Sequence, residues 1–475
     1  MTFEDNRQYI ETLEKSGDAV RINEEVDWDL EVGAISRLSR ELAAPSPFFQ
    51  NIKDYPGMRM FGVPFVQHRR LAIALGMPPD SHPRALQQEY ERRSRHPLKP
   101  ILVSNGPCKE NKLFGKDVDL CRFPVPIIHE GDGGRYIGSW HIVINKDPDS
   151  DWTNWGMYRT MLQDRRHVSI HLHAGNDGGR IFQRKYKAVG KPMPVAIAIG
   201  IDPCSAIVSS IRFEAGISEA EYAGSLLGKP VQLVKCETND LLVPATSEIV
   251  LEGVVYPNAI APEGPFGEYT GYRTNWEWKE ICRIDAVTWR NNPILTFGNP
   301  GVPGKGGPES PVSAWEILLK KALMERAIPV TDVFIPAETV GFLIIIGVKR
   351  TRQGNMATKV RNVVRSQGIR CEKIIVVDED VDVFDMSSVL LSFATRCHPG
   401  RSVHIDTHDT SSSLTPYLTA RERNFQIGAS MLMDCTWPVE WSPEHDIPPI
   451  VTFEQTYSED IRDKVKAKWH KYGFK

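Results

Sequence analysis

The chain has 475 residues, of which 41% are hydrophobic and 25% are charged, and its formal net charge is -3. This length predicts two or three domains of ordinary globular composition. The charge leaves no extended basic surface and no apolar run reaches the ~18–20 residues that cross a bilayer, so we expect neither a nucleic-acid nor a membrane partner.

The N-terminal segment, MTFEDNRQYIETLEKSGD, is acidic and amphipathic and lacks the apolar core of a signal peptide. The eight cysteines stand singly, without a CxxC pair, so neither a zinc ribbon nor a disulfide framework is indicated. Both features favour a cytoplasmic protein.

The first hundred residues predict helices around one strand. Asn6 is a candidate cap for a helix that carries Tyr9, Ile10 and Leu13, and residues 19–27 are typical of a strand. A second helix is expected at about 29–43, where apolar residues recur on one side: Leu30, Val32, Ile35, Leu38 and Leu42. The Arg-rich segment 78–98 indicates a surface helix and a linker, not a basic binding patch.

The sequence changes character at about residue 100. Short β-rich runs separated by Gly, Pro, Asn and Asp continue to about 300 and predict a β-rich, barrel-like domain. After the glycine-proline stretch 298–311, a helix and then alternating strands and helices predict a separate α/β domain, with 340–348 as a buried strand. The tail predicts an amphipathic helix that docks on another surface or subunit.

The segment EGPFGE places Glu263 and Glu268 five residues apart across a Gly-Pro-Phe-Gly turn. Glycines let the backbone approach a ligand closely, and two acids in different environments can divide into a proton donor and a charged partner. From the spacing alone, an acidic surface turn is the commoner explanation. The glycine-rich segments 131–135 and 175–180 fit no nucleotide fingerprint and are expected to be plain turns.

Two further groups of residues suit a ligand site. Arg159 closes the segment NWGMYR and could hold a buried carboxylate ionised, although a surface arginine beside a stacked Trp is the simpler explanation. Histidines and acids could join Asn154 as ligands of Mn²⁺ or Mg²⁺, or the histidines could be ordinary strand residues: His167, His171, His173, Glu219 and Glu221.

Taken together, six stretches resemble the UbiD family of decarboxylases, and more closely its ferulic-acid-decarboxylase-like branch. They occur in family order and cover nearly the whole chain: GPCKEN at 106–111, FPVPIIHEGDGGRYIG at 123–138, TNWGMYR at 153–159, CETNDLLVPATSEIVLEG at 236–253, EGPFGEYTGY at 263–272 and FATRCHPG at 393–400. The resemblance implies reversible, non-oxidative decarboxylation of an aromatic acid. It also implies prenylated FMN from a flavin prenyltransferase, a divalent metal (Mn²⁺ or Mg²⁺) and K⁺.

The resemblance also implies an α+β fold and a division of the chain. We expect a prenyl-FMN- and metal-binding domain at 1–305, with an α/β part at about 1–100 and a split β-barrel at about 101–305. A linking helix at 306–330, an α/β oligomerisation domain at 331–450 and a docking helix at 451–475 follow. A homo-oligomer, either a dimer or a hexamer, is expected.

Family roles carry over to individual residues of this sequence. Glu268 matches the proton donor, and Arg159 and Glu263 match the ion pair that positions the cofactor and tunes Glu268. Asn154 and Glu219 match metal ligands that tie the flavin phosphate to the protein. The remaining expected cofactor neighbours are Trp155, Gly156, Met157, Tyr158, Asn176 and Asp177, and K⁺ is expected near the backbone of Trp155, Val208, Ser209 and Ile211.

This sequence departs from the family pattern at two places. The metal-binding histidine of relatives falls on Asp177, so either Asp177 is the third ligand, which we prefer, or His173 reaches in. In the expected substrate pocket Phe393 and Leu414 are retained, but Ala314 replaces a larger aliphatic residue and Ser412 replaces phenylalanine. Loss of a ring removes much of a ~150–250 Å² packing surface, so we expect a wider pocket that suits a fused-ring or heteroaromatic acid.

Two other functions remain open on the sequence. A flavin-dependent oxidoreductase on a split barrel would share much of the fold. A non-catalytic subunit of a carboxylase complex is the second alternative, although such a subunit has no need of Arg159, Glu263 and Glu268 together.

Overall fold

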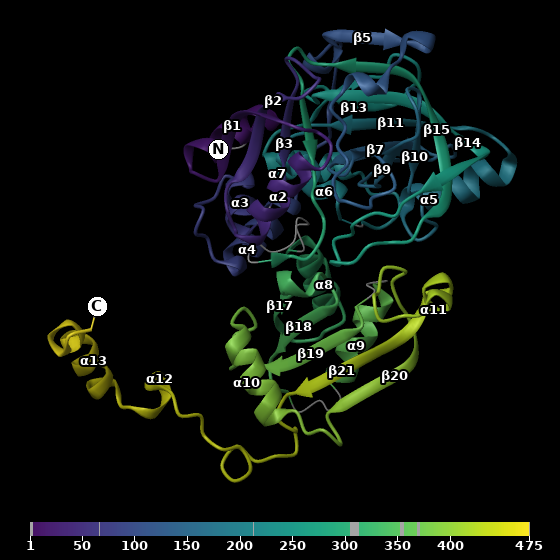
Figure 1. Cartoon of the computed structure of the whole chain (residues 1–475). Coiled ribbons are helices and arrows are strands. Elements are labelled where there is room, and N and C mark those ends of the chain that lie inside the picture. Colours follow the sequence, from purple (N-terminus) through teal and green to yellow (C-terminus); the bar gives the residue numbers. More distant parts are fainter. Residues whose placement is uncertain are drawn as a thin grey trace.

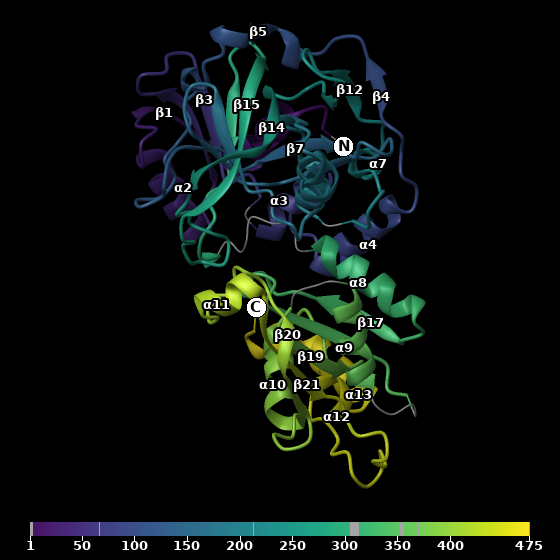
Figure 2. The same ribbon diagram turned by 90° about the vertical axis from the view of Figure 1, so that its right-hand side faces the viewer.

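The computed structural model describes residues 3–65, 67–211, 213–304, 313–351, 356–367 and 371–474, without the side chains of Gln67, Ser313 and Ala314. Figures 1 and 2 show an N-terminal body (residues 3–304), a C-terminal body (residues 313–435) and a C-terminal tail (residues 436–474) that extends away from both. None of the helices in these residues combines the length and hydropathy needed to cross a bilayer.

The N-terminal body begins with a four-stranded sheet, in the order β1-β2-β3-β16. Its strands are β1 (Ala19–Val26), β2 (Ser46–Ile52), β3 (Arg59–Gly62) and β16 (Ile294–Phe297), and helices α1 (Asn6–Lys15), α2 (Glu31–Glu41) and α3 (Gln67–Ala74) flank them. β16 follows the large sheet in sequence but pairs with β3, so the first hundred residues and the β-rich segment share one sheet.

Two expectations about these helices were wrong. The N-cap of α1 is Asp5, whose side chain accepts a hydrogen bond from the backbone N–H of Gln8, and Asn6 is the first helical residue. Leu38 and Leu42 are exposed, at 58% and 63%. α2 buries Val32, Gly33, Ser36 and Arg40 instead. A Cβ on Gly33 would lie 1.9 Å from Ile128 O, so this face of α2 packs directly against the backbone near Ile128.

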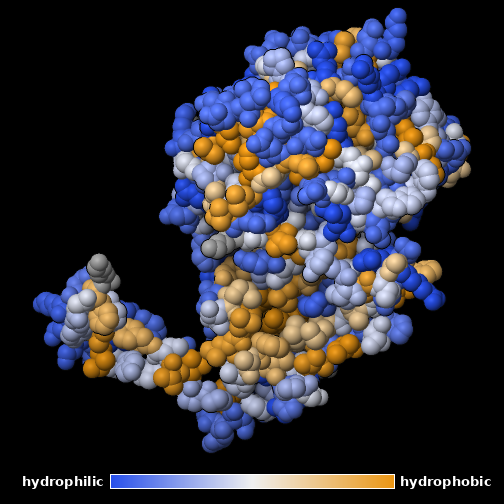
Figure 3. Space-filling model, viewed as in Figure 1, coloured by the Kyte–Doolittle hydropathy of each residue, from blue (hydrophilic) through white to orange (hydrophobic). Residues whose placement is uncertain are grey.

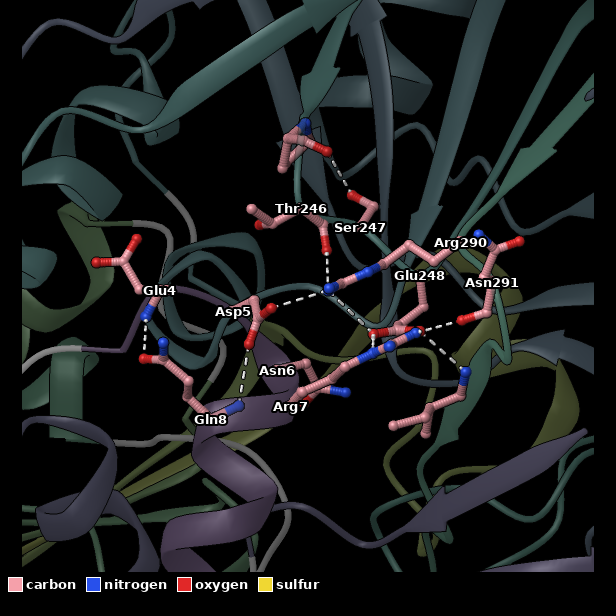
Figure 4. Close-up of polar contacts among 12 residues, drawn as sticks. Glu4, Asp5, Asn6, Arg7, Gln8, Thr246, Ser247, Glu248, Arg290 and Asn291 are labelled. Atoms are coloured by element: carbon pink, nitrogen blue, oxygen red, sulfur yellow. Dashed lines mark hydrogen bonds and ion pairs between the residues drawn. The ribbon is translucent and has the colours of Figure 1, made fainter. Parts of the chain in front are cut away.

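A buried ion-pair cluster fastens α1 to the large sheet (Figure 4). Arg7 donates from Nε and Nη2 to the two oxygens of Glu248, at 2.7 and 2.8 Å, and Glu248 has no exposed side-chain surface. Arg290 Nη1 lies 2.8 Å from Asp5 and 3.3 Å from Glu248. Two cations and two anions therefore neutralise each other where the N-terminus meets β14 and the end of β15.

The large sheet has nine strands, in the order β6-β9-β10-β15-β14-β11-β7-β8, with β5 paired to β15. They are β5 (Asn111–Phe114), β6 (Tyr136–Gly138), β7 (His141–Lys146), β8 (Thr153–Gly156), β9 (Thr160–Leu162), β10 (His167–Ile170), β11 (Met193–Ile199), β14 (Ile249–Glu263) and β15 (Glu277–Trp289). The sheet curves into the half-barrel predicted for this segment (Figure 1).

Further elements complete the N-terminal body. A small sheet, β13-β12-β4, comprises β4 (Ile101–Val103), β12 (Gln232–Lys235) and β13 (Leu242–Pro244). The helices are α4 (Pro83–Ser94), α5 (Asp177–Ile181), α6 (Pro203–Ser209) and α7 (Glu219–Leu227). α4 is the predicted surface helix, but it also buries Leu86 and Tyr90, and its Arg92 and Arg93 pair with Glu89.

The C-terminal body is a five-stranded sheet between helices, as expected for an α/β domain. The order is β17-β18-β19-β21-β20, from β17 (Val330–Phe334), β18 (Leu343–Val348), β19 (Lys373–Asp378), β20 (Val403–Thr410) and β21 (Ile427–Cys435). Alternation along β18 sends Ile344 and Ile346 into one core, and Ile345 into the other. The helices are α8 (Ser313–Glu325), α9 (Met356–Ser366), α10 (Met386–Arg396) and α11 (Ala420–Phe425).

The C-terminal tail forms α12 (Phe453–Thr456) and α13 (Glu459–Lys468). The helix predicted near the end of the chain is present, yet neither α12 nor α13 has a buried residue. Trp437, Pro438 and Trp441 still contact the C-terminal body, but Figure 1 shows the part of the tail that carries α12 and α13 reaching outward without lying on either body. The expected docking of this helix is therefore not made within the single chain.

Candidate active site

The structure brings together the three residues expected to do the chemistry. Glu263 is the last residue of β14, Glu268 follows the Gly-Pro-Phe-Gly turn, and Arg159 lies between β8 and β9. Arg159 Nε and Nη2 donate to the two oxygens of Glu263, at 2.9 and 2.8 Å, and Nη1 contacts Glu268 Oε1. One guanidinium is thus shared by two carboxylates.

Glu263 is held ionised in a buried position. Burial opposes its charge, but His171, Arg159 and Tyr136 outweigh that cost and lower the pKa of Glu263 to about 2. Tyr136 donates its hydroxyl hydrogen to Glu263 Oε1 at 2.7 Å. Nδ1 of His171 lies 3.9 Å from Glu263 Oε2, and burial lowers the pKa of His171 to about 4, so this imidazole is neutral near pH 7.

The charges in this group do not balance. Arg159 supplies one positive charge, neutral His171 supplies none, and two ionised glutamates would supply two negative charges. The side chains of Arg159, Glu263 and Glu268 are 8%, 0% and 12% exposed, so water compensates little of the excess. Glu263 and Glu268 therefore share a single buried cation.

The loop 129–135 braces the turn that carries Glu268. Asp132 Oδ1 accepts a hydrogen bond from the backbone N–H of Gly267 at 3.0 Å, and Gly133 N–H donates to Pro265 O at 2.7 Å. A Cβ on Gly133 would lie 2.0 Å from Gly264 O, so the two loops touch through backbone. The residue pattern at 131–135 predicted a plain turn without this supporting role, and no pattern indicated the contact of Tyr136 with Glu263.

Asn154 and Glu219, the two expected metal ligands, lie in adjacent buried positions. Glu219 Oε2 accepts from the backbone N–H of Trp155 at 3.2 Å, and Asn154 donates to Asn145 Oδ1 at 2.9 Å. Burial raises the pKa of Glu219 to about 8, because little positive charge faces it. A carboxylate and an amide oxygen in this setting fit a hard divalent cation.

Asp177, the third expected metal ligand, already has a charged partner in Arg180. Asn176 caps α5 and Asp177 is the first residue of that helix, where it contacts Arg180. The hydroxyl of Tyr158 accepts hydrogen bonds from Gly178 N at 3.1 Å and Asn154 Nδ2 at 3.2 Å, so it joins α5 to Asn154. In the described part of the chain, groups of three or more His, Cys, Asp and Glu suited to a metal are absent.

His173 points to a different partner. Its Nδ1 accepts from Gly175 N–H at 2.9 Å, and its Nε2 lies 2.7 Å from the side-chain amide of Gln426 in the C-terminal body. Both ring nitrogens are therefore engaged away from Asn154 and Glu219. This observation favours Asp177 over His173 as the third ligand.

The segment expected to line the cofactor crosses the half-barrel next to α6. Trp155 is 2% exposed, and Met157 N–H donates to Ser209 O at 3.0 Å, which brings residues 155–157 against the end of α6. Burial raises the pKa of Tyr158 to about 12, so its phenol stays neutral. The backbone of Trp155, Val208, Ser209 and Ile211, the expected K⁺ neighbourhood, thus belongs to two touching segments.

The expected substrate-pocket residues lie in the C-terminal body. Phe393 is on α10 and is 39% exposed, and Ser412 and Leu414 lie in the loop between β20 and α11. The structure does not bring Phe393 next to the other two, because α10 contacts the end of β21 at Cys435, whereas the loop contacts Gln426 at the start of that strand. Figure 1 shows that loop and α11 at the end of the C-terminal body that faces the half-barrel. The side chain of Ala314, at the start of α8, is outside the described part of the chain.

A surface cavity of about 460 Å³ lies elsewhere, beside β4 and β12. Three lysines line it, but each is already paired: Lys109 with Glu252 and Glu237, Lys112 with Glu237, and Lys235 with Asp240. Its charges are therefore balanced, and it is separate from the Arg159 group.

Comparison with known proteins identifies the family. Three models of 3-octaprenyl-4-hydroxybenzoate carboxy-lyase (UbiD) domains match: the N-terminal domain at 10–90, the Rift-related domain at 101–303 and the C-terminal domain at 313–435. Pyrrole-2-carboxylic acid decarboxylase of Pseudomonas aeruginosa is 33% identical over 99% of this chain and 98% of its own length. Ferulic acid decarboxylase 1 of Saccharomyces cerevisiae is 31% identical over the same shares.

Solved structures agree. The closed form of vanillic acid decarboxylase from Sedimentibacter hydroxybenzoicus has a TM-score of 0.89 at 30% identity, covering 99% of each chain, and its open form has 0.83 at 29% identity, covering 99% of this chain and 100% of that one. An evolved dimeric form of HmfF from Pelotomaculum thermopropionicum in complex with prFMN has 0.78 at 26% identity, covering 97% and 100%. The α+β fold is confirmed, and the chain belongs to the UbiD family of decarboxylases.

Proposed function

We propose that this protein uses prenylated FMN and a divalent metal to remove carbon dioxide reversibly from an aromatic or heteroaromatic carboxylic acid. The observation that carries the proposal is the sharing of one buried guanidinium, that of Arg159, by Glu263 and Glu268. Glu263 stays ionised, so Glu268 is the group that can hold a proton and release it to the substrate carbon.

The residues at the site fit the cofactor and the metal. Asn154, Glu219 and Asp177 supply oxygen donors for Mn²⁺ or Mg²⁺, which would link the flavin phosphate to the protein. Residues 154–159 and Asn176 would line the flavin, and backbone oxygens near Ser209 would hold K⁺. The flavin, when bound, supplies an electron sink for the bond that loses carbon dioxide. A flavin prenyltransferase would be the supplier of this cofactor.

The protein's own groups have separate tasks. Arg159 fixes the orientation of both carboxylates, and its contact with Glu263 prevents Glu263 from competing for the proton. Tyr136, hydrogen-bonded to Glu263, keeps that side chain in place. Glu268 transfers its proton to the substrate carbon after carbon dioxide leaves and takes up another from solvent. Asp132 and Gly133 hold the turn on which Glu268 sits.

The proposed substrate class rests on the residues of the loop between β20 and α11, where Ser412 and Leu414 lie. Ser412 stands where a phenylalanine is expected, which predicts a wide pocket beside Leu414. The similarity to pyrrole-2-carboxylic acid decarboxylase supports a heteroaromatic acid. Restoring the ring with Ser412→Phe should narrow the pocket and shift the preference from bicyclic acids toward cinnamic acid. Good turnover of cinnamic acid and none of bicyclic or tricyclic acids by the unaltered enzyme would contradict this assignment.

The assembly is a homo-oligomer in this proposal. Figure 3 shows a broad apolar area on the C-terminal body, toward the side from which the tail leaves. On α10, Leu390 and Leu391 are 56% and 64% exposed, and the tail exposes apolar side chains: Ile450, Val451, Phe453, Tyr457, Ile461 and Trp469. A tail that docks on a second copy would bury both surfaces. Deleting residues 451–475 should lower the mass measured by light scattering, and an unchanged mass would contradict the docking.

We also propose the expected division of the chain into parts at 1–305, 306–330, 331–450 and 451–475. β16, which returns to pair with β3, supports treating the first part as one unit.

The test of the function is co-expression with a flavin prenyltransferase, followed by an absorbance spectrum and a panel of acids assayed for carbon dioxide release. Release from at least one aromatic or heteroaromatic acid, dependent on prenylated FMN, is the expected result. Redox turnover with ordinary flavin and no carbon dioxide would favour the oxidoreductase. Absence of both activities in a flavin-loaded enzyme would favour the non-catalytic subunit.

A further inference from the structure

His173 and Gln426 make a polar contact between the half-barrel and the C-terminal body. The side-chain amide of Gln426 lies 2.7 Å from Nε2 of His173. Gln426 follows α11, in a left-handed backbone conformation with φ of 53°. Figure 1 shows α11 at the end of the C-terminal body nearest the half-barrel. Polar contacts between the bodies also form at α4, where Gln87 bonds Glu316 and Arg84 pairs with Asp332.

The direction of the hydrogen bond can be assigned from its surroundings. Nδ1 of His173 accepts a hydrogen bond from Gly175 N–H at 2.9 Å. A neutral imidazole has one acceptor and one donor, so Nε2 of His173 carries the hydrogen. Gln426 must therefore present its amide oxygen, which a half-turn of the amide group brings to the contact position. Position 426 requires an acceptor.

On the half-barrel side, His173 is connected to the Arg159 group. The backbone N–H of His171 donates to Arg159 O at 3.1 Å, and His171 Nδ1 lies 3.9 Å from Glu263 Oε2. The rings of His171 and His173 are nearly parallel, with centroids 6.2 Å apart. Asn176 N–H donates to His173 O at 3.0 Å, which ties His173 to the start of α5.

On the other side, Gln426 is connected to the proposed substrate wall. Its carbonyl oxygen accepts a hydrogen bond from Ser411 N–H at 2.9 Å. The hydroxyls of Ser411 and Thr415 both donate to Oε1 of buried Glu372, at 2.6 and 2.7 Å. The segment 411–415, which contains Ser412 and Leu414, is thus held to Gln426 at one end and to the core of the C-terminal body.

The contact between His173 and Gln426 forms in a structure that resembles a closed form of a related enzyme. The whole chain is more similar to the closed form of the Sedimentibacter enzyme, with a TM-score of 0.89, than to its open form, with 0.83. A contact across the bodies that involves the substrate wall suits that arrangement.

We propose that His173 and Gln426 are positioning residues, which set the substrate wall at 411–415 against the Arg159–Glu263–Glu268 group. Their hydrogen bonds to Gly175, Asn176 and Ser411 join the half-barrel to the substrate wall, so we expect them to affect how the acid substrate is placed. This inference rests on the proposed function. A reacting geometry displaced by about 1 Å can cost ~10²-fold in rate, so loss of one hydrogen bond here is expected to lower kcat/KM by about 10-fold or more.

The kinetic test separates acceptors from other side chains at position 426. Gln426→Met keeps the length but removes the acceptor, Gln426→Glu keeps an acceptor, and Gln426→Lys offers only donors. We expect kcat/KM to fall about 10-fold in Gln426→Met and Gln426→Lys through a lowered kcat, with flavin content and spectrum unchanged, and to stay within about threefold in Gln426→Glu. Arg421→Met, on the exposed side of the same helix, is the matched control and should match the unaltered enzyme. Equal kcat/KM values for Gln426→Met and Gln426→Glu would overturn the proposal.

A second readout does not depend on activity. In Gln426→Met, amide hydrogen exchange should rise both at 411–416 and at 171–176, although the substitution lies in only one of the two bodies. His173→Phe, which keeps a flat ring beside His171, should raise exchange at 411–416 in the same way. Unchanged exchange across the bodies in both variants would refute the contact. If the unaltered holoenzyme released no carbon dioxide from any acid, the proposed function would fail, while this exchange measurement would still decide the role of His173 and Gln426.

Discussion

Two buried arginine–glutamate clusters in the N-terminal body differ in how their charges balance. Around Glu248, two arginines meet two carboxylates, and both oxygens of Glu248 are saturated by Arg7, Arg290 and the backbone N–H of Ile294 (Figure 4). Around Glu263, Arg159 alone serves two glutamates. The first cluster pairs two arginines with two carboxylates, whereas in the second cluster two carboxylates share one arginine.

The difference shows how similar residues divide between structure and chemistry. In the Glu248 cluster every carboxylate oxygen is hydrogen-bonded, so these carboxylates are not expected to exchange protons. This cluster therefore serves to hold α1 on the sheet. A cluster with one carboxylate in excess must hold a proton or bear the cost of an uncompensated buried charge. We therefore propose that the chemistry takes place at Arg159, and the following changes test that division in order of expected effect.

Arg159→Ala should have the largest effect. It leaves Glu263 buried without its cation, which costs about 3–5 kcal/mol of unfolding free energy, and it removes the group that orients Glu268, so turnover should be lost. Urea unfolding and carbon dioxide release measure the two effects. Arg165→Ala, at an arginine that is 76% exposed, is the control and should change stability by less than about 0.5 kcal/mol. A stable, active Arg159→Ala enzyme would refute the role of the shared guanidinium.

Glu248→Ala should separate stability from activity. It leaves Arg7 and Arg290 facing each other, at a cost of about 3 kcal/mol, the lower end for a broken buried pair because both arginines keep some exposure. Turnover per folded, flavin-loaded molecule should stay within about twofold of the unaltered enzyme, since no step uses this cluster. A specific loss of turnover in folded molecules would show that the two clusters are not independent.

The pH dependence of stability should reveal His171. Burial lowers its pKa to about 4 in the folded protein, against about 6.5 when unfolded. Between those values the unfolded chain binds more protons, so stability falls as the pH drops from about 6.5 to 4, by on the order of 1–3 kcal/mol. The pKa of Glu263 is about 2 in the folded protein, so its contribution to the free energy of unfolding is lost at lower pH, between about 4.5 and 2.

His171→Asn should therefore flatten the loss between about pH 6.5 and 4. Because His171 also helps to lower the pKa of Glu263, the loss in the lower window should shrink as well. Unfolding curves at a series of pH values measure both windows. Identical slopes for the variant and the unaltered protein between pH 6.5 and 4 would show that His171 is not held neutral by the fold.

Asp5→Ala should have the smallest effect. It removes the cap of α1 and one partner of Arg290, at a cost of about 1–2 kcal/mol, without a change in turnover per folded molecule. Thermal unfolding measures it. A loss of activity at constant folded fraction would contradict the assignment of the Glu248 cluster to structure alone.

Much of the fold could be predicted because local patterns agree with it. The apolar run at 340–348 contains the buried strand β18, and Tyr9, Ile10 and Leu13 are buried as their helical spacing predicted. Leu38 and Leu42 were placed wrongly, because a helical period shows which residues share a face but not which face meets the sheet. The cap at Asp5 instead of Asn6 is a shift of one residue, which spacing cannot resolve between two capping residue types.

Some residues of the site could be predicted and others could not, because local sequence patterns do not show contacts between distant segments. Glu263 and Glu268 are near each other in sequence, but Arg159 reaches them only because β14 and β8 belong to one curved sheet. Family motifs supplied that juxtaposition, which spacing alone does not show. Asp132 was missed because its partner is a backbone N–H, that of Gly267, and backbone partners leave no trace in residue type. Gln426 was missed because its contact joins two bodies.

The measurement that tests the central claim most directly is carbon dioxide release by Glu268→Gln, loaded with prenylated FMN to the same content as the unaltered enzyme. Glutamine keeps the size and the contact to Arg159 but cannot transfer the proton. The account predicts a fall in turnover of about 10²- to 10⁴-fold with flavin retained. Turnover within about twofold of the unaltered enzyme would contradict the assignment of Glu268 as the proton donor.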